Sequence, residues 1–150
     1  IILLDQFSRH IYRGSKDSYK NDFASLLFVK QGFQVYGPEL EGYEFMFAFM
    51  PYMHTENLEL QLEGKAIFDR YYKATQDLVY DHKSYLTDEE SKKLAQEWEM
   101  FKEMKPHAEG HLKCIQTFGR FPKRNKALGR KSTEEEEEYM EKPEVKKRPY

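Results

Sequence analysis

Apolar side chains recur at intervals of three and four residues along most of the chain, which is the spacing that one face of an α-helix requires. Residues 1–13 follow this spacing, and Gly14 is expected to end the segment. The pattern predicts a second helix over residues 17–31 with Gly32 as its end, because glycine weakens a helix interior. Residues 32–42 are rich in turn-forming residues and are expected to be a connection.

The middle of the chain predicts two more helices and a loop. Residues 43–53 are apolar nearly all round, which is typical of a helix that is buried on most faces, and Pro51 should kink or end it. Thr55 is expected to cap a helix over residues 56–74. Residues 75–86 lack a clear period and are interpreted as a loop.

A capping box marks the start of the longest predicted helix. Thr87 and Glu90 have the spacing at which each side chain bonds the other's free backbone N–H group. The helix should run to Phe118, with an interruption or bend at Pro106, and Gly119 should end it by adopting a left-handed conformation.

The C-terminal part predicts a short last helix and a tail. A second capping box, within residues 132–136, begins the helix, and the run of glutamates 134–138 is expected to be its solvated first turns. Residues 143–150 are basic and contain proline, so they are expected to be flexible or docked on a partner.

No alternating strand pattern is present, so the predicted fold class is all-α, built from stacked helical hairpins. Residues 1–142 are expected to form one all-helical domain, a size that suits a single core. No consensus repeat is visible, so periodicity alone does not predict a regular solenoid.

Composition narrows the compartment and the partners. The net charge of −2 excludes a generally basic nucleic-acid binder and argues against nucleic acid as a partner. The single cysteine, Cys114, excludes an internal disulfide, favours an intracellular location, and lies in an apolar run where we expect an inert buried thiol. No apolar run is long enough to span a membrane. The chain starts inside a helical pattern without Met, so upstream residues, and any targeting signal, are expected to be missing.

The familiar catalytic motifs are absent or incomplete. His54 and Glu56 match the H-x-E part of zinc deaminase sites, but one cysteine cannot supply the remaining ligands. The H-E-x-x-H, G-x-S-x-G, P-loop and G-x-G-x-x-G patterns do not occur. A nucleophilic pair of Cys114 and His111 is disfavoured by the apolar surroundings. We therefore expect no cofactor and no metal.

The most unusual feature is the basic loop, Gly119 to Arg130, which carries arginines and lysines on a backbone stiffened by proline. Guanidinium groups on a stiff loop bind carboxylates or phosphates through paired hydrogen bonds. The alternative is structural: Arg120 and Arg124 would then pair with internal carboxylates such as Asp5 or Glu56.

Three segments, residues 2–14, 49–58 and 111–140, together resemble the family known as domain of unknown function 924. Its patterns are approximately LLDQFxRNIxRG, LPFMHSE and HxxIIxxFGRFPHRNxxLGRxSTxEE. The resemblance implies a tetratricopeptide-like bundle of helical hairpins and a tryptophan-containing N-terminal part that this chain lacks. The chain departs from the patterns at His10, where Asn is usual, and at Lys123, where His is usual.

The resemblance also implies a candidate polar cluster or ligand-binding site. The family's polar signature falls on Asp5, Gln6, Arg9, His54, Glu56, His111, Arg120, Arg124 and Asn125. Such a cluster can be an internal network that fixes helix packing, or it can line a ligand pocket. The right ligand types for a metal are present without a diagnostic spacing.

We expect an interaction or scaffold module, such as a subunit of a larger assembly, with protein as the partner. The alternative is a small-anion-binding protein or enzyme. In it Arg9, Arg120 and Arg124 clamp an anion. His54 or His111, acting together with Glu56 or Asp5, exchanges protons with the ligand. RNA binding through the basic loop is a weaker third hypothesis.

Overall fold

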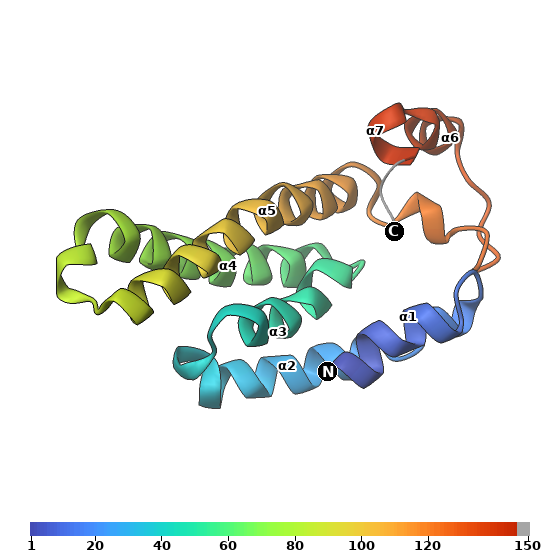
Figure 1. Ribbon diagram of the computed structural model, residues 1–150. Coiled ribbons are helices and arrows are strands. Elements are labelled where there is room, and N and C mark those ends of the chain that lie inside the picture. The colour runs from blue at the N-terminus through green and yellow to red at the C-terminus, as the bar shows by residue number, and fades with distance from the viewer. Residues whose placement is uncertain (147–150) are drawn as a thin grey trace.

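The computed structural model describes residues 1–146, and none of these residues forms a β-strand, so the predicted all-α class is confirmed (Figure 1). The α-helices are α1 (Ser8–Ile11), α2 (Asp22–Tyr36), α3 (Gly42–His54), α4 (Leu58–Asp81), α5 (Asp88–Phe118), α6 (Glu134–Glu141) and α7 (Pro143–Lys146). A π-helical turn, Leu3–Phe7, precedes α1. Short 3₁₀ turns lie at Lys16–Ser18, Gly37–Glu39, Lys83–Tyr85 and Pro122–Arg124.

Helix α2 differs from its prediction at both ends. It begins at Asp22, because Ser15 caps a separate 3₁₀ turn, and it continues through Gly32 to Tyr36. Glycine in a helix interior costs about 1 kcal/mol relative to alanine. Here that cost is outweighed by Phe33, which packs on the core with its ring centroid 5.8 Å from that of Phe45. The expected connection over residues 32–42 is therefore shortened.

Helix α4 is longer than predicted, so the interpretation of residues 75–86 as a loop was wrong up to Asp81. The extension packs along α5, where Thr75 is buried and the rings of Tyr80 and Trp98 meet edge to face at 5.9 Å. The cap is Asn57 rather than Thr55, because Asn57 accepts a hydrogen bond from the N–H of Leu60 at 3.0 Å.

The other helix boundaries agree well with their local signals. Both capping boxes are present, and the second one joins Thr133 to Glu136. Gly119 ends α5 with a φ of 66°. Neither Pro51 nor Pro106 ends its helix; buried residues on both sides of each keep α3 and α5 packed on the core.

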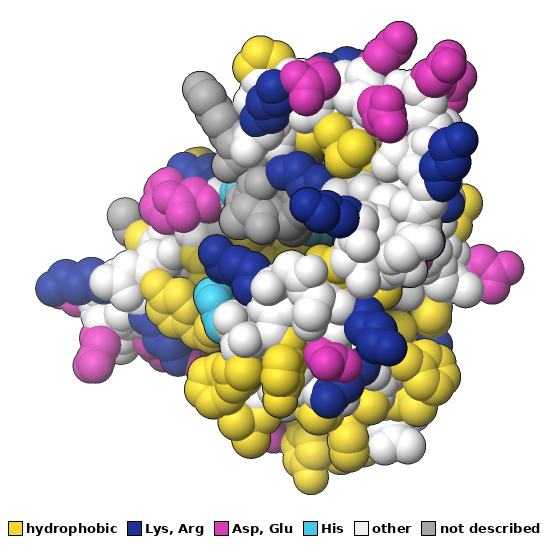
Figure 2. Space-filling model, turned by 90° about the vertical axis from the view of Figure 1, so that its right-hand side faces the viewer, with side chains coloured by type: hydrophobic (Ala, Val, Ile, Leu, Met, Phe, Trp, Pro, Cys, Tyr) yellow, Lys and Arg dark blue, Asp and Glu magenta, His cyan; other side chains and the backbone are white. Residues whose placement is uncertain are grey.

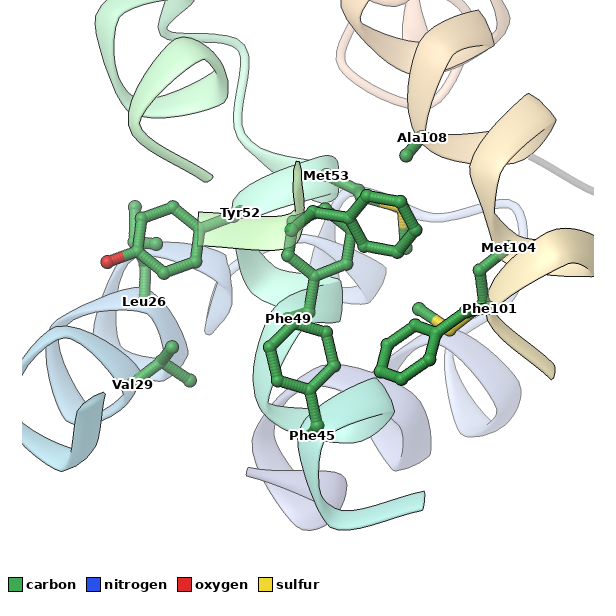
Figure 3. Close-up of a cluster of buried hydrophobic side chains, with 10 residues drawn as sticks. Leu26, Val29, Phe45, Phe49, Tyr52, Met53, Phe101, Met104 and Ala108 are labelled. Carbon is green, nitrogen blue, oxygen red and sulfur yellow. The ribbon is translucent and has the colours of Figure 1, made fainter. Parts of the chain in front are cut away.

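Helix α3 lies at the centre and contacts α2, α4 and α5, as its nearly uniform apolar composition predicted. Its Phe45 and Phe49 stack with ring centroids 6.0 Å apart, and Phe45 meets Phe101 of α5 (Figure 3). Both rings also contact Phe68 of α4. Helix α4 approaches closely because Gly64 has no side chain at the point of contact.

A smaller cluster lies where α5 ends and α6 begins. Cys114, Ile115 and Phe121 are buried there, and Phe118 and Tyr139 pack against them. The expectation of a buried thiol is thus confirmed. In the expected tail, residues 143–146 form α7 with Val145 buried, and residues 147–150 lie outside the described residues. Within the described part, no helix combines the length and apolarity needed to cross a membrane.

Candidate functional site

The candidate residues lie in two adjoining hydrogen-bonded networks where α1, α3 and the basic loop meet. The inner network consists of Asp5, Gln6, Arg9, Asp22, His54 and Arg124. The outer network consists of Glu56, Arg120, Asn125, Arg130 and Glu136. His111 of α5 lies beside His54, with the two ring centroids 5.9 Å apart.

Asp5 is the centre of the inner network and is completely buried. Its Oδ1 accepts a hydrogen bond from Arg9 at 3.1 Å and lies 2.7 Å from Nδ1 of His54. The side-chain amide of Gln6 also donates to Asp5. The π-helical turn therefore binds the C-terminal half of α3 through the carboxylate of Asp5 and through Gln6, whose amide also donates to the sulfur of Met50 at 3.1 Å.

Arg124 connects the basic loop to this carboxylate cluster. It donates to Asp22 at 3.2 Å and to the backbone carbonyl of His54 at 2.8 Å. Its guanidinium carbon lies 4.6 Å from the ring centroid of Tyr19 and 4.4 Å from that of Phe121. The side chain is 9% exposed, so these groups replace its water shell almost completely.

The charges in the inner network follow from burial and from these partners. Burial alone would raise the pKa of Asp5, but the contacts with His54 and Arg9 outweigh it and lower the pKa from 3.8 to about 2. Burial, together with the positive charges of Arg9 and Arg124, lowers the pKa of His54. At neutral pH the pair is thus a carboxylate that accepts from the Nδ1–H group of a neutral imidazole.

The outer network begins at Glu56, immediately after α3. Its carboxylate receives two hydrogen bonds from Arg130, at 2.6 and 2.9 Å, and one from the backbone N–H of Phe121 at 2.8 Å. Burial would raise the pKa of Glu56, and these donors lower it instead. The beginning and the end of the basic loop are thereby attached to the same side chain.

Glu136 completes the outer network from the first turn of α6. It accepts from Arg120 at 2.6 and 2.8 Å and from Asn125 at 3.0 Å, and Arg120 holds its pKa at about 2, below the usual 4.5. Asn125 in turn accepts from Arg130 at 3.0 Å. Glu136 is only 2% exposed, so the expectation of a fully solvated glutamate run was wrong for this residue.

The arginine partners differ from those suggested by the sequence. Arg120 pairs with Glu136 and Arg124 with Asp22, not with Asp5 or Glu56. Glu56 instead pairs with Arg130. Asp22, Arg130 and Glu136 belong to the networks although the sequence does not predict them as site residues. Two of them could have been found from the sequence: Glu136 is part of a capping box, and Arg130 lies close to the other arginines of the basic loop. No sequence pattern points to Asp22.

His111 is buried next to the inner network, on the side of His54. Its Nδ1 lies 2.8 Å from the carbonyl oxygen of His107, and its ring meets Phe121 edge to face at 5.5 Å. Burial lowers its pKa from 6.5 to about 3, so the ring is neutral at physiological pH.

A groove of about 1130 Å³ runs between α3 and α5 and reaches both histidines. Its inner end is lined by His54, His107 and His111. Methionines line its middle: Met46, Met50, Met53, Met100 and Met104. Glutamates lie along the rest of the groove, with Glu41 and Glu44 at the start of α3.

The arginines, the possible metal ligands and the histidines of the candidate site differ in their ability to bind a ligand. Arg9, Arg120 and Arg124 each already donate to a carboxylate, so an external anion there would compete with an internal partner. Among the residues that the structure describes, no three His, Cys, Asp or Glu side chains are grouped as metal ligands. His54, which bonds to the buried Asp5, and His111 are the candidate residues that line the groove.

Comparison with known proteins supports the resemblance seen in the three segments. A family described as "Bacterial protein of unknown function (DUF924)" matches residues 1–144. The chain is similar to the solved structure of the protein of unknown function ATU0120 from Agrobacterium tumefaciens. The two share 26% sequence identity and superpose with a TM-score of 0.63. The match covers 93% of this chain and 64% of that chain, so this chain spans less than two thirds of that protein's length. A comparison with curated proteins gives no match. The match over nearly the whole chain shows that the protein belongs to the DUF924 family.

Proposed function

We propose that this chain is a protein-interaction module whose two polar networks are structural. In this proposal the networks hold the basic loop against α1 and α3, and the helical surfaces contact another protein. The expected tetratricopeptide-like stacking of hairpins belongs to the same proposal, since such arrays present extended surfaces to partners.

The observation that carries the proposal is an exposed apolar face on the first two helices and the turn before them. Leu3 and Ile11 are each 69% exposed, Phe23 is 68% exposed and Phe28 is 62% exposed. Hydrophobic side chains gather in the lower half of Figure 2, where α1 and α2 lie. Burying one such side chain is worth roughly 1.5–3 kcal/mol, and contiguous apolar patches of this kind mark interaction sites.

The internal pairing of the arginines supports a structural role for the networks. Arg124 is nearly buried and donates to Asp22 and to the carbonyl of His54. Arg120 forms two hydrogen bonds with the buried Glu136. Breaking such a pair to bind an external anion would leave a buried carboxylate without its partner, which costs several kcal/mol.

Site-specific photo-crosslinking in the cells that make the protein tests the proposal. Benzoylphenylalanine replaces Phe23 in one variant and Phe28 in another, and replaces the exposed Gln76 of α4 in the control. We expect the same protein adduct from positions 23 and 28, and no such adduct from position 76. Absence of an adduct at both apolar positions, or an identical adduct pattern at position 76, would refute the proposal.

A second candidate function is proton transfer to a small ligand, and the Asp5–His54 pair is the observation that favours it. Asp5 fixes the Nδ1 side of a neutral imidazole that lines the groove, an arrangement suited to a general base. Titration of the protein with phosphate and with short carboxylates, followed by ¹⁵N NMR of the histidine rings, tests this. A response of His54 without one of the exposed His82 supports it, and equal responses oppose it.

A further inference from the structure

We infer that the groove between α3 and α5 is a docking site for a basic amphipathic helix of a partner protein. The inference rests on the proposed interaction function and assigns a partner chemistry to a surface separate from the apolar face of α1 and α2. Four features of the groove carry it: its floor, its rim, its length and the elements that form its walls.

The floor of the groove is made of methionine. Five of the six methionines in the chain line it, three from α3 and two from α5. Met46, Met50 and Met100 are only partly buried, so apolar side-chain surface stays open to a ligand. Unbranched, polarisable methionine side chains adapt their shape to different apolar partners, which suits them to grooves that accept helices.

The rim of the groove is acidic. Glutamates 41, 44, 97, 99 and 103 line it, and among the residues that the structure describes Lys93 is the one lysine or arginine beside them. Lys93 already donates to Glu41. Burial and the charge of Glu41 raise the pKa of Glu97, which indicates that negative charges crowd this rim. A partner with lysines or arginines flanking an apolar stripe would relieve that repulsion while burying the methionines.

The walls and the length of the groove favour a helical partner. Both walls are helices, and none of the described residues offers the free edge of a sheet to an extended peptide. The groove extends along α3 from Gly42 to His54, a span of 13 residues or about 20 Å at 1.5 Å per residue. A partner helix of about four turns fits this span, with apolar anchors at i, i+3, i+4 and i+7.

Fluorescence anisotropy with designed peptides tests the inference on the full chain. The probe is a labelled 14-residue peptide in which leucines occupy one helical face and lysines the other. One comparison peptide has the same composition in scrambled order, and a second has glutamate in place of every lysine. We expect the first peptide to bind at least about tenfold more tightly than either comparison, with affinity that falls as salt rises.

Charge-reversal variants locate the binding. Glu44→Lys with Glu97→Lys should weaken binding of the basic peptide by about tenfold or more. Glu138→Lys, on the exposed face of α6 away from the groove, is the control and should leave it unchanged. Met100→Gln should weaken binding as well, because it replaces part of the apolar floor. Circular dichroism confirms that each variant remains folded before it is compared.

Three results would overturn the inference. These are equal binding of the scrambled peptide, equal or tighter binding of the acidic peptide, and equal effects of the groove and control variants. If the peptide and variant experiments give these results while crosslinked adducts still form at positions 23 and 28, only the proposal that the groove binds a basic helix is wrong. If the adducts are missing as well, the proposed interaction function is wrong with it.

Discussion

Arg124→Ala separates a structural basic loop from an anion-binding one. The substitution removes ionic hydrogen bonds to Asp22 and to the carbonyl of His54, together with contacts to two aromatic rings. Each charged hydrogen bond contributes roughly 1.5–3 kcal/mol and each ring contact about 0.5–2 kcal/mol. Relief of the buried guanidinium's desolvation offsets part of this sum. We expect a net loss of about 3 kcal/mol in the free energy of unfolding.

Urea unfolding followed by far-UV circular dichroism measures this loss. A domain of this size has a stability of roughly 5–15 kcal/mol, so the variant should remain folded in buffer with a lower midpoint and an unchanged slope. The melting temperature should fall by about 6–12 °C. Arg124→Lys keeps the charge but not the planar fork, and should recover only part of the stability.

Arg70→Ala is the matched control, because Arg70 is exposed on α4. It should change stability by less than about 0.5 kcal/mol. If Arg124→Ala unfolds at the same urea concentration as Arg70→Ala, the ion pairs of the inner network do not hold the fold together. The structural interpretation of the basic loop would then be refuted, and an external anion would become the better explanation for this arginine.

Two further predictions concern close packing and acid stability. Gly64→Ala should destabilise by about 1–3 kcal/mol in the same urea assay, because its Cβ would lie 2.5 Å from Cβ of Tyr52. Gly32→Ala meets no atom within 4 Å and should stabilise by about 0.5–1 kcal/mol; similar effects of the two would contradict the close contact. The pKa of about 3 for His111 means that the unfolded state takes up its proton first, near pH 6.5. Stability is therefore lost as pH falls, by about 2 kcal/mol at pH 5, and His111→Gln should flatten this dependence. Asp5, whose pKa falls from 3.8 to about 2, contributes stability that is lost only between about pH 4 and pH 2. An unchanged profile for His111→Gln would show that this imidazole is not buried in neutral form.

The inner network and the groove meet at His54. This residue is held by Asp5 on one side and lines the inner end of the groove on the other. A ligand that displaces the methionines near His54 would therefore also contact the imidazole of His54, which bonds to the N-terminal turn. The position of His54 gives the groove a direct physical connection to the contact between the N-terminal π-helical turn and α3.

Local patterns in the sequence were sufficient to predict elements whose stabilising contacts lie within one helical turn. The capping boxes at Thr87 and Thr133 and the left-handed cap at Gly119 all formed as predicted, because each needs only residues three or four positions apart. The nearly uniform apolar face of residues 43–53 likewise predicted the central helix. The gathering of the candidate residues followed from the family resemblance rather than from spacing.

Contacts between distant segments decided the rest. Helix α2 continues through Gly32, and α4 continues past residue 74, because side chains from other helices bury their extended faces. Arg124 and Asp22 are separated by 102 positions, so no local pattern could indicate that they pair. The groove is a property of two helices that meet only in the folded chain. Helix formation could be read from the sequence because its hydrogen bonds are local, whereas charge pairing and surface shape depend on the tertiary arrangement.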